Sequence, residues 1–384
     1  MKNKNIGFFS NQFTTNQGHG IARYSKYLCS HLKELKSNYN FIPIATGSEK
    51  KSRELRLLKD NSGLRILPFG RKITPLLWKY LNFPKIENMI DCNINLLHAH
   101  SLTYPIATNK PYIVTIHDIG PLTHPQFFTK KDNWLMKESF RQIVKKADHL
   151  ICVSKYTATE VELFCKKNYH QSIEKRISVV YEGVGKFFFN KIKLNQIADN
   201  DKIKFLKEKK FILCVGKLSP RKNFSSVIKA FNLIKNSFDH HLIAVGGDGW
   251  DFKKSKQYIN SLKLQNRVHM IGFVSDELLR YLYTKASVFV YPSLFEGFGL
   301  TILEAMACQC PVITSNKSSL PEIAGRCATI IDPMDIDQLS ESIISVCRDN
   351  SEIKSQKSSG LKRAKSLNWN KTAKETHILY EKYV

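Results

Sequence analysis

The chain has 384 residues, of which 42% are hydrophobic, and its 59 lysine and arginine residues against 33 acidic residues give a formal net charge of +26. This length suits two domains of roughly 150–200 residues each, and the hydrophobic content excludes an intrinsically disordered chain. No apolar run approaches the ~18 residues of a membrane span, and the apolar stretch near the N-terminus is too short for a signal peptide.

The nine cysteines are scattered without the spacing of a zinc site, which favours reduced thiols in a cytoplasmic protein over a disulfide framework. The large positive charge calls for an explanation. No nucleic-acid-binding motif and no basic stripe interleaved with aromatic residues is present, so no nucleic acid partner is expected. Attraction to an anionic inner-membrane surface and a compositional drift towards lysine both account for the charge, and both explanations stay open.

The N-terminal half alternates short apolar strands with amphipathic helices. A strand at residues 6–10 and a helix beginning near Ile21 enclose a polar loop that contains Gly18 and Gly20. Glycines in such a loop allow the backbone to approach a phosphate closely. Further strands are expected at residues 41–44, 94–100, 112–118, 149–154 and 176–184.

Residues 71–81 mix cations with Leu76, Leu77, Trp78, Tyr80 and Leu81. A basic helix that carries aromatic side chains can lie on a bilayer interface. The alternative, which is the more frequent outcome for helices of this kind, is that the apolar face is buried in the helix's own domain.

His117 and Asp118 end the strand at residues 112–118, at the edge of the sheet where α/β proteins bind their ligands. His117 can hydrogen-bond a sugar hydroxyl while Asp118 fixes its ring, or it can be satisfied by neighbouring backbone groups. His98 and His100, at the end of the strand 94–100, are weaker candidates for the same role.

Residues 191–209 are rich in lysine, asparagine and aspartate and are expected to link a domain of residues 1–190 to one of residues 210–360. The second domain opens with a strand at 211–216, followed by the cations Lys217, Arg221 and Lys222. Three cations after a strand can neutralise a diphosphate, although an ordinary surface turn is the alternative. Gly246 and Gly247 follow the next strand, and another strand is expected at 268–274.

A strand at 286–291, a glycine-bearing turn and a helix at 300–307 form the most informative segment of the chain. The turn aims the backbone N–H groups of residues 297–300 and the positive end of a helix dipole at an anion. Glu296 and Glu304, eight residues apart, lie roughly on one side of this site. A carboxylate beside a phosphate is repelled unless it binds hydroxyls, which a ribose and a sugar ring both offer.

Glu296 and Glu304, set in Glu-Gly-Phe-Gly-Leu and Glu-Ala-Met-Ala, resemble the signature of the retaining glycosyltransferases of family 4. The phrase His-Asp-Ile-Gly-Pro-Leu-Thr-His-Pro from His117 resembles a subgroup that includes mannosyltransferases of bacterial polysaccharide and lipopolysaccharide synthesis. The resemblance implies the α/β fold called GT-B, with two facing Rossmann-like domains, parallel sheets and a cleft between them. It also implies that residues 361–384 form a helix that crosses back to the first domain.

The resemblance implies transfer of a hexose, best matched by mannose from GDP-mannose, to a hydroxyl of a glycan or lipid-linked glycan, with retained anomeric configuration and no metal or other cofactor. The implied catalytic residues are Glu296, His117, Lys222 and Arg221. The implied donor-binding residues are Gly18, Gly20, Lys217, Gly246, Gly247, Phe273, Gly297, Phe298, Gly299, Leu300 and Glu304. Among them, Glu304 would bind the ribose, and Glu296 and His117 the transferred sugar.

Two alternatives to this function stay open. A family 4 enzyme can use a UDP-sugar, such as UDP-glucose or UDP-N-acetylglucosamine, in place of GDP-mannose. A non-catalytic basic scaffold at a membrane surface can also keep the GT-B fold, although the presence of both glutamates, Lys222 and His117 argues against it.

Overall fold

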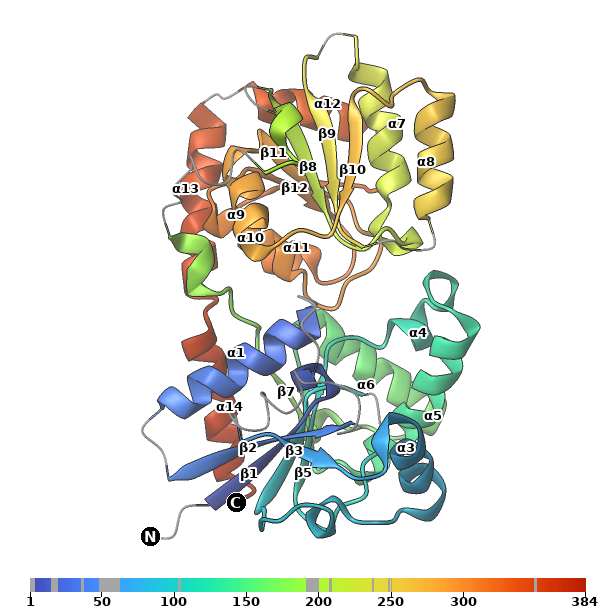
Figure 1. Ribbon diagram of the computed structural model, residues 1–384, viewed down its shortest axis with the longest axis vertical. Coiled ribbons are helices and arrows are strands. Elements are labelled where there is room, and N and C mark those ends of the chain that lie inside the picture. Colours follow the sequence, from blue (N-terminus) through green and yellow to red (C-terminus); the bar gives the residue numbers. More distant parts are fainter. Residues whose placement is uncertain are drawn as a thin grey trace. The chain divides into compact units, whose positions relative to one another are not determined.

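The computed structural model describes residues 4–14, 20–35, 38–47, 63–102, 105–190, 200–206, 209–236, 238–247, 249, 251–348 and 351–384, without the side chains of residues 14, 71 and 72. The chain forms two compact units (Figure 1): Met1–Gly183 together with Trp369–Val384, and Val184–Asn368. Each unit is a parallel sheet with helices packed on it, and each is described separately below.

The first unit contains a seven-stranded sheet with the order β3-β2-β1-β4-β5-β6-β7. The strands are β1 (Lys4–Phe9), β2 (Tyr39–Thr46), β3 (Arg65–Leu67), β4 (Leu96–Ala99), β5 (Tyr112–Ile116), β6 (His149–Cys152) and β7 (Ile177–Val179). β4, β5 and β6 are buried along their whole length. A strand buried on both faces needs apolar residues at successive positions, which explains why these segments read as continuous apolar runs.

The helices of the first unit are α1 (Gly20–Glu34), α3 (Gly70–Leu81), α4 (Gly120–Thr123), α5 (Lys130–Lys146), α6 (Lys155–Tyr169) and α14 (Trp369–Glu381), with 3-10 turns η1 (Asn11–Thr14), η2 (Ile86–Asn88), η3 (Pro125–Phe127) and η4 (Glu174–Arg176). α5 begins with a capping box formed by Thr129 and Asp132, and Ser154 caps α6 by accepting from the Thr157 N–H at 3.0 Å. These caps satisfy backbone donors that have no partner within the helix.

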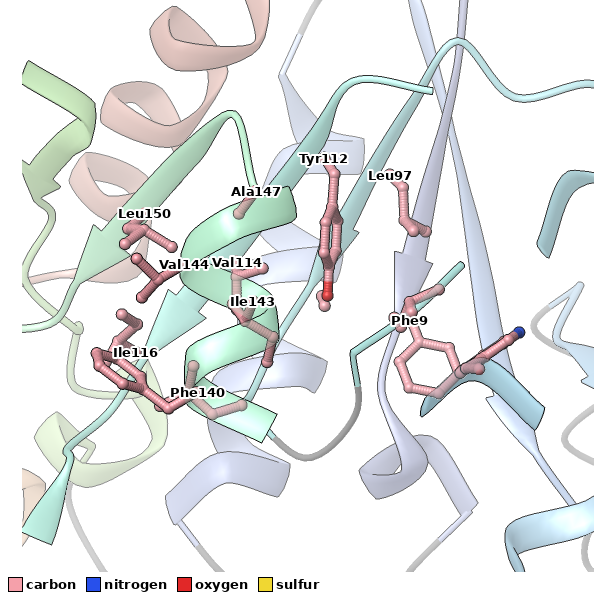
Figure 2. Packing of buried hydrophobic residues seen from close by; sticks show 14 of the residues in the cluster. Phe9, Leu97, Tyr112, Val114, Ile116, Phe140, Ile143, Val144, Ala147 and Leu150 are labelled. Atoms are coloured by element: carbon pink, nitrogen blue, oxygen red, sulfur yellow. The ribbon is translucent and has the colours of Figure 1, made fainter. Parts of the chain in front are cut away.

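Figure 2 shows the main hydrophobic core of the first unit, where α5 packs on the sheet. Phe140, Ile143 and Val144 of α5 are all buried and lie against Val114 and Ile116 of β5. Burying side chains of this size removes their apolar surface from water, which is the main favourable term in folding.

The second unit contains a six-stranded sheet with the order β10-β9-β8-β11-β12-β13. The strands are β8 (Phe211–Val215), β9 (His241–Val245), β10 (Val268–Gly272), β11 (Val288–Tyr291), β12 (Val312–Ser315) and β13 (Thr329–Ile331). The helices are α7 (Phe224–Ile234), α8 (Phe252–Ser261), α9 (Asp276–Lys285), α10 (Leu300–Ala307), α11 (Leu320–Ala324), α12 (Ile336–Cys347) and α13 (Ser351–Ser366), with 3-10 turns η5 (Lys186–Phe189), η7 (Lys204–Leu206) and η8 (Pro220–Lys222).

The strand order reverses once in each sheet. In the first unit the reversal lies between β1 and β4, and in the second between β8 and β11. At such a point the loops leaving two neighbouring strands diverge and open a crevice beyond their carboxyl ends, where open α/β sheets bind ligands. In the second unit this position is flanked by the loops that carry Lys222 and Glu296.

The division of the chain differs in detail from the predicted boundaries. The second unit begins at Val184 rather than after a linker that ends at residue 209. The η5 turn belongs to it, and Arg280 donates to the Phe187 carbonyl at 2.7 Å. α13 packs on α10 within this unit, so the chain returns to the first unit at Trp369 rather than at residue 361. Residues 191–199 and 207–208 of the predicted linker lie outside the described residues.

Among the helices of the described residues, none combines the length and the apolar character that a bilayer span requires.

Candidate active site

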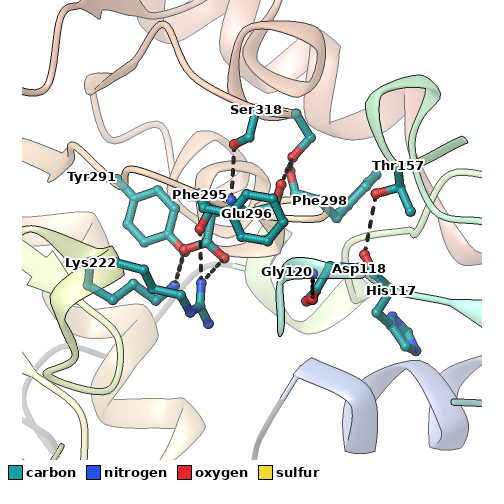
Figure 3. Close-up of polar contacts among 12 residues, drawn as sticks. His117, Asp118, Gly120, Thr157, Lys222, Tyr291, Phe295, Glu296, Phe298 and Ser318 are labelled. Atoms are coloured by element: carbon teal, nitrogen blue, oxygen red, sulfur yellow. Dashed lines mark hydrogen bonds and ion pairs between the residues drawn. The ribbon is translucent and has the colours of Figure 1, made fainter. Parts of the chain in front are cut away.

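Two cations and a carboxylate meet at the strand reversal of the second unit (Figure 3). The η8 turn after β8 carries Arg221 and Lys222, and the loop after β11 carries Glu296. Arg221 Nη1 lies 2.6 Å from Glu296 Oε2, and Lys222 Nζ lies 2.5 Å from Glu296 Oε1. The structure therefore brings together three of the four residues predicted to be catalytic.

The electrostatics of this cluster follow from its burial. The Glu296 side chain is only 10% exposed, and burial alone would raise its pKa. The charges of Arg221 and Lys222 and their hydrogen bonds outweigh that effect and lower the pKa to about 2. Glu296 is therefore ionised at neutral pH, and the cluster of two cations and one anion keeps a net positive charge that attracts an anionic ligand.

Tyr291, the last residue of β11, is a further member of the cluster. Its hydroxyl accepts a hydrogen bond from Lys222 Nζ, and the same ammonium lies 4.5 Å from the centroid of its ring. Tyr291 is buried, and its pKa is raised well above the usual value, first by burial and then by the negative charge of Glu296. The phenol therefore stays neutral and holds the Lys222 side chain in place.

The turn between β11 and α10 is held by serine side chains (Figure 3). Ser318 Oγ accepts from the Glu296 N–H at 3.0 Å, and Ser319 Oγ lies 3.0 Å from the Glu296 carbonyl and 2.9 Å from that of Phe298. Gly299 has a φ of 100°, and a Cβ there would come within 2.8 Å of Leu320 Cδ2. Only glycine fits this position, where the chain turns into α10 and places the positive end of its dipole at the cluster.

Glu304 lies one helical turn further along α10. It is 1% exposed, and the Tyr283 hydroxyl lies 3.4 Å from Glu304 Oε2. Neither Glu296 nor Glu304 is displayed to solvent, as a surface acid would be. Buried carboxylates require polar partners, which the cations supply for Glu296 and Tyr283 supplies in part for Glu304.

The loops after β8 and β9 approach each other through glycine. A Cβ on Gly246 would lie 2.1 Å from the Gly216 carbonyl oxygen, so any other residue would force the two strand ends apart. Gly247 has open space around it and accepts from the Leu218 N–H at 3.4 Å. Lys217, in the loop after β8, is exposed.

Phe273 follows β10 and is 54% exposed, and its carbonyl accepts from Lys202 Nζ at 2.6 Å. Gly297, Phe298 and Leu300 lie in or beside the turn described above. The roles predicted for these residues in donor binding stay predictions.

In the first unit, His117 lies directly after β5 with both ring nitrogens occupied. Nδ1 lies 2.9 Å from Glu182 Oε1, and Nε2 donates to the His100 carbonyl at 3.0 Å. The ring is fixed by Glu182 and not, as predicted, by Asp118, whose Oδ1 instead accepts from the Gly120 N–H at 2.9 Å. A contact between His117 and a donor sugar stays a prediction, and it requires the ring to exchange one of these partners.

His98 and His100 are both completely buried in the first unit. His98 bridges Tyr380 Oη at 2.7 Å and Thr115 Oγ1 at 2.8 Å, and burial, followed by the His117 charge, lowers its pKa to about 3. The His100 ring lies among aromatic rings, 5.0 Å from that of Phe8. This arrangement suits a neutral structural histidine better than a ligand-binding one.

Gly18 lies outside the described residues, whereas Gly20 is the exposed first residue of α1. Within the described ranges, no three histidine, cysteine, aspartate or glutamate side chains gather where they could bind a metal ion.

Two families of known proteins match the sequence. The profile described as Glycosyltransferase Family 4 matches residues 18–185, and that described as Glycosyl transferases group 1 matches residues 195–363. The O-antigen chain mannosyltransferase B of Escherichia coli is 30% identical over 376 residues, which cover 94% of this chain and 96% of that protein. The O-antigen chain mannosyltransferase RfbU of Salmonella typhimurium is 32% identical over 268 residues, 69% of each chain.

Solved structures with low sequence identity share the fold. Sucrose-phosphate synthase from Thermosynechococcus elongatus matches with a TM-score of 0.78 at 18% identity, over 99% of this chain and 98% of that one. HepE of Anabaena, in complex with UDP and glucose, matches with a TM-score of 0.75 at 17% identity, over 99% of this chain and 100% of that one.

Proposed function

The chain belongs to glycosyltransferase family 4 and has the GT-B fold, and from this premise we propose that it transfers mannose from GDP-mannose to a hydroxyl of a growing cell-surface glycan with retention of configuration. That it is a glycosyltransferase follows from the family. The donor, the acceptor and the stereochemistry are the parts that we propose.

The observation that carries the proposal is the Arg221–Lys222–Glu296 cluster at the strand reversal of the second unit. A nucleoside diphosphate carries its negative charge on the phosphates and its hydroxyls on the ribose and the sugar. Cations at the beginning of a helix suit the phosphates, and the carboxylates of Glu296 and Glu304 suit the hydroxyls. The second unit therefore carries both the cations and the carboxylates that the two kinds of groups on one ligand require.

In the proposed reaction, the bond between the sugar C1 and the phosphate oxygen breaks, and a bond between C1 and the acceptor oxygen forms on the same face of the sugar. The acceptor proton passes to the departing phosphate. Arg221 and Lys222 stabilise the charge that develops on this leaving group, and removing one such donor lowers the rate by about 10²–10³-fold. We assign this charge stabilisation to the two side chains rather than to a metal ion, so transfer is expected to persist with a chelator present.

The choice of mannose rests on the curated relatives. Escherichia coli O-antigen chain mannosyltransferase B aligns over almost the whole chain, and RfbU over two thirds of it. A UDP-sugar is the alternative, because HepE, which shares the fold, was solved with UDP and with UDP-glucose. The relatives with higher sequence identity favour mannose, and with it GDP as the nucleotide.

The test is a thermal-shift screen of the full chain with GDP, UDP, ADP and dTDP. A ligand present at a hundredfold its Kd stabilises the folded protein by about 2.7 kcal/mol, which is readily seen as a rise in Tm. GDP is expected to give the largest shift. A larger shift with UDP would replace the proposed donor, and no shift with any nucleotide would contradict the proposed nucleotide site.

The stereochemistry is tested separately by incubating the enzyme with the donor that the screen selects and a mannose-terminated acceptor. NMR of the product is expected to show the anomeric configuration of the donor. An inverted product would contradict the proposed same-face reaction.

A further inference from the structure

An apolar stripe lies exposed on α3 of the first unit. Phe69, Ile73, Leu76 and Tyr80 follow one another at intervals of four, three and four residues, which places them on one face of the helix. Their exposed fractions are 45%, 54%, 55% and 68%. Leu81 and Phe83, just beyond, are 65% and 61% exposed. Large apolar side chains that gather in this way mark an interaction surface.

The opposite face of α3 anchors the helix in its domain. Thr74 and Trp78 are completely buried, and Trp78 Nε1 donates to the Pro84 carbonyl at 2.8 Å. The Trp78 ring also packs against that of Phe9, 5.6 Å away. Since the buried face already fixes the helix, the exposed stripe is not needed to hold α3 in place.

The stripe continues onto α5, which lies beside α3 (Figure 1). Trp134 and Leu135 of α5 are 53% and 44% exposed. Lys79 joins the two helices, because its Nζ lies 4.4 Å from the Trp134 ring centroid, 5.0 Å from that of Tyr80 and 3.2 Å from Glu138 Oε2. Lys146 Nζ also donates to Asn82 Oδ1 at 2.9 Å.

Cations border this apolar surface. α5 carries six lysine and arginine residues against two acids, one of which, Glu138, is paired with Lys79. Trp134, Glu138, Arg141 and Lys145 follow at intervals of four, three and four, so the cations continue the face that begins with Trp134. The groove between α5 and α6 is lined by Trp134, Lys137, Arg141 and Lys145.

We propose that the exposed faces of α3 and α5, with Phe69, Ile73, Leu76, Tyr80 and Trp134 at the centre and Lys137, Arg141 and Lys145 at the edge, dock the protein on an anionic lipid bilayer. Apolar and aromatic side chains surrounded by cations match the two layers of a bilayer interface, the acyl region and the anionic headgroups. The net charge of +26 on the whole chain attracts it to such a surface. The docking does not depend on which sugar the enzyme transfers.

The proposal is tested by cosedimentation of the full chain with vesicles of phosphatidylcholine alone and of phosphatidylcholine with phosphatidylglycerol. The Ile73→Ser/Leu76→Ser variant is expected to bind the anionic vesicles about tenfold more weakly than the wild type. Its matched control is Leu233→Ser/Ile378→Ser, which changes the same two residue types in helices α7 and α14, at exposures of 57% and 55%. The control is expected to bind like the wild type.

The role of charge has its own pair of variants. Changing Lys137, Arg141 and Lys145 to glutamine is expected to weaken binding to anionic vesicles by tenfold or more and to flatten its salt dependence. The control changes the exposed Lys253, Lys254 and Lys256 of α8 to glutamine and removes the same charge. If both triple variants lose binding equally, net charge and not this surface is responsible, and the proposal is wrong.

Trp134 provides a direct readout of contact. Spin-labelled lipid is expected to quench wild-type tryptophan fluorescence, and the quenching is expected to fall markedly in Trp134→Phe, which keeps an aromatic ring at the surface. Equal quenching of both proteins would overturn the proposed orientation. Equal vesicle binding by Ile73→Ser/Leu76→Ser and the wild type would overturn the docking surface itself. A wild-type dimer in sedimentation velocity that becomes a monomer in Ile73→Ser/Leu76→Ser would also overturn it, because a second copy of the chain would then cover the stripe.

Discussion

Replacing Glu296 with glutamine removes one negative charge from the cluster and keeps the side-chain shape. The pKa of Glu296 lies near 2 instead of the ordinary 4.5, because the attraction of Arg221 and Lys222 outweighs the burial of the carboxylate. A shift of this size corresponds to about 3 kcal/mol of stability at neutral pH. The side chains of Arg221 and Lys222 are only 28% and 13% exposed, so little water replaces the lost partner.

The stability difference between wild type and Glu296→Gln depends on pH. A carboxyl whose pKa is depressed by folding stabilises the protein above its unfolded pKa, near 4.5, and loses that contribution as the pH falls towards 2. Glutamine does not titrate. The difference in unfolding free energy between wild type and Glu296→Gln is therefore expected to shrink from about 3 kcal/mol at pH 7 to about 2 kcal/mol at pH 3.5.

Denaturant unfolding of both proteins at the two pH values measures this difference. GDP titration and a transfer assay then measure the affinity for the nucleotide and the rate of transfer. Transfer is expected to fall by about 10²–10³-fold, while GDP affinity stays equal or rises because a negative charge near the phosphates is gone. A difference below about 0.5 kcal/mol at pH 7, or one that does not change with pH, would contradict a stabilising charge interaction between Glu296 and the two cations. Loss of GDP affinity together with stability would instead mean that glutamine disrupts the site.

Three further changes test other parts of the structure. Lys222→Ala is expected to weaken GDP binding by about 10–100-fold in calorimetry, since a hydrogen bond to a charged group contributes about 1.5–3 kcal/mol. Lys217→Ala, at an exposed position, is expected to weaken it less. Equal effects of the two changes would contradict the role given to Lys222. Gly299→Ala is expected to destabilise the protein by about 1–3 kcal/mol because of its φ of 100° and the contact with Leu320, while Gly247→Ala, with open space around it, costs little. Tyr380→Phe is expected to cost about 1–3 kcal/mol in denaturant unfolding, because buried His98 Nδ1 loses its partner, and a smaller loss would mean that the His98 ring finds another.

The sequence predicted most of the parallel strands, because a buried strand leaves a short continuous apolar run. It did not predict β3, β12 or β13, which have only three or four residues each. It also predicted that Lys222 and Glu296 both follow strands. It did not predict that they form an ion pair, since strands β8 and β11 are neighbours only through the reversal of the strand order. Tyr291 lies at the end of the predicted strand 286–291, and nothing in its spacing indicated a contact with Lys222.

Other features depended on competition between partners that spacing alone does not resolve. Asp118 is next to His117 in sequence, but the ring pairs with Glu182, 65 residues away, while Asp118 accepts from the Gly120 N–H at the start of α4. For α3, the sequence left open whether the apolar face is buried or lies on a membrane. Both faces of the helix are apolar, and the domain buries the one that carries Trp78.

A crystal structure of the protein with GDP tests the central claim most directly. The account predicts the two phosphates within hydrogen-bonding distance of Lys222 Nζ, the Arg221 guanidinium and the backbone amides of residues 297–300, with a ribose hydroxyl at the Glu304 carboxylate. A nucleotide bound elsewhere, with the Arg221–Lys222–Glu296 cluster untouched, would contradict it.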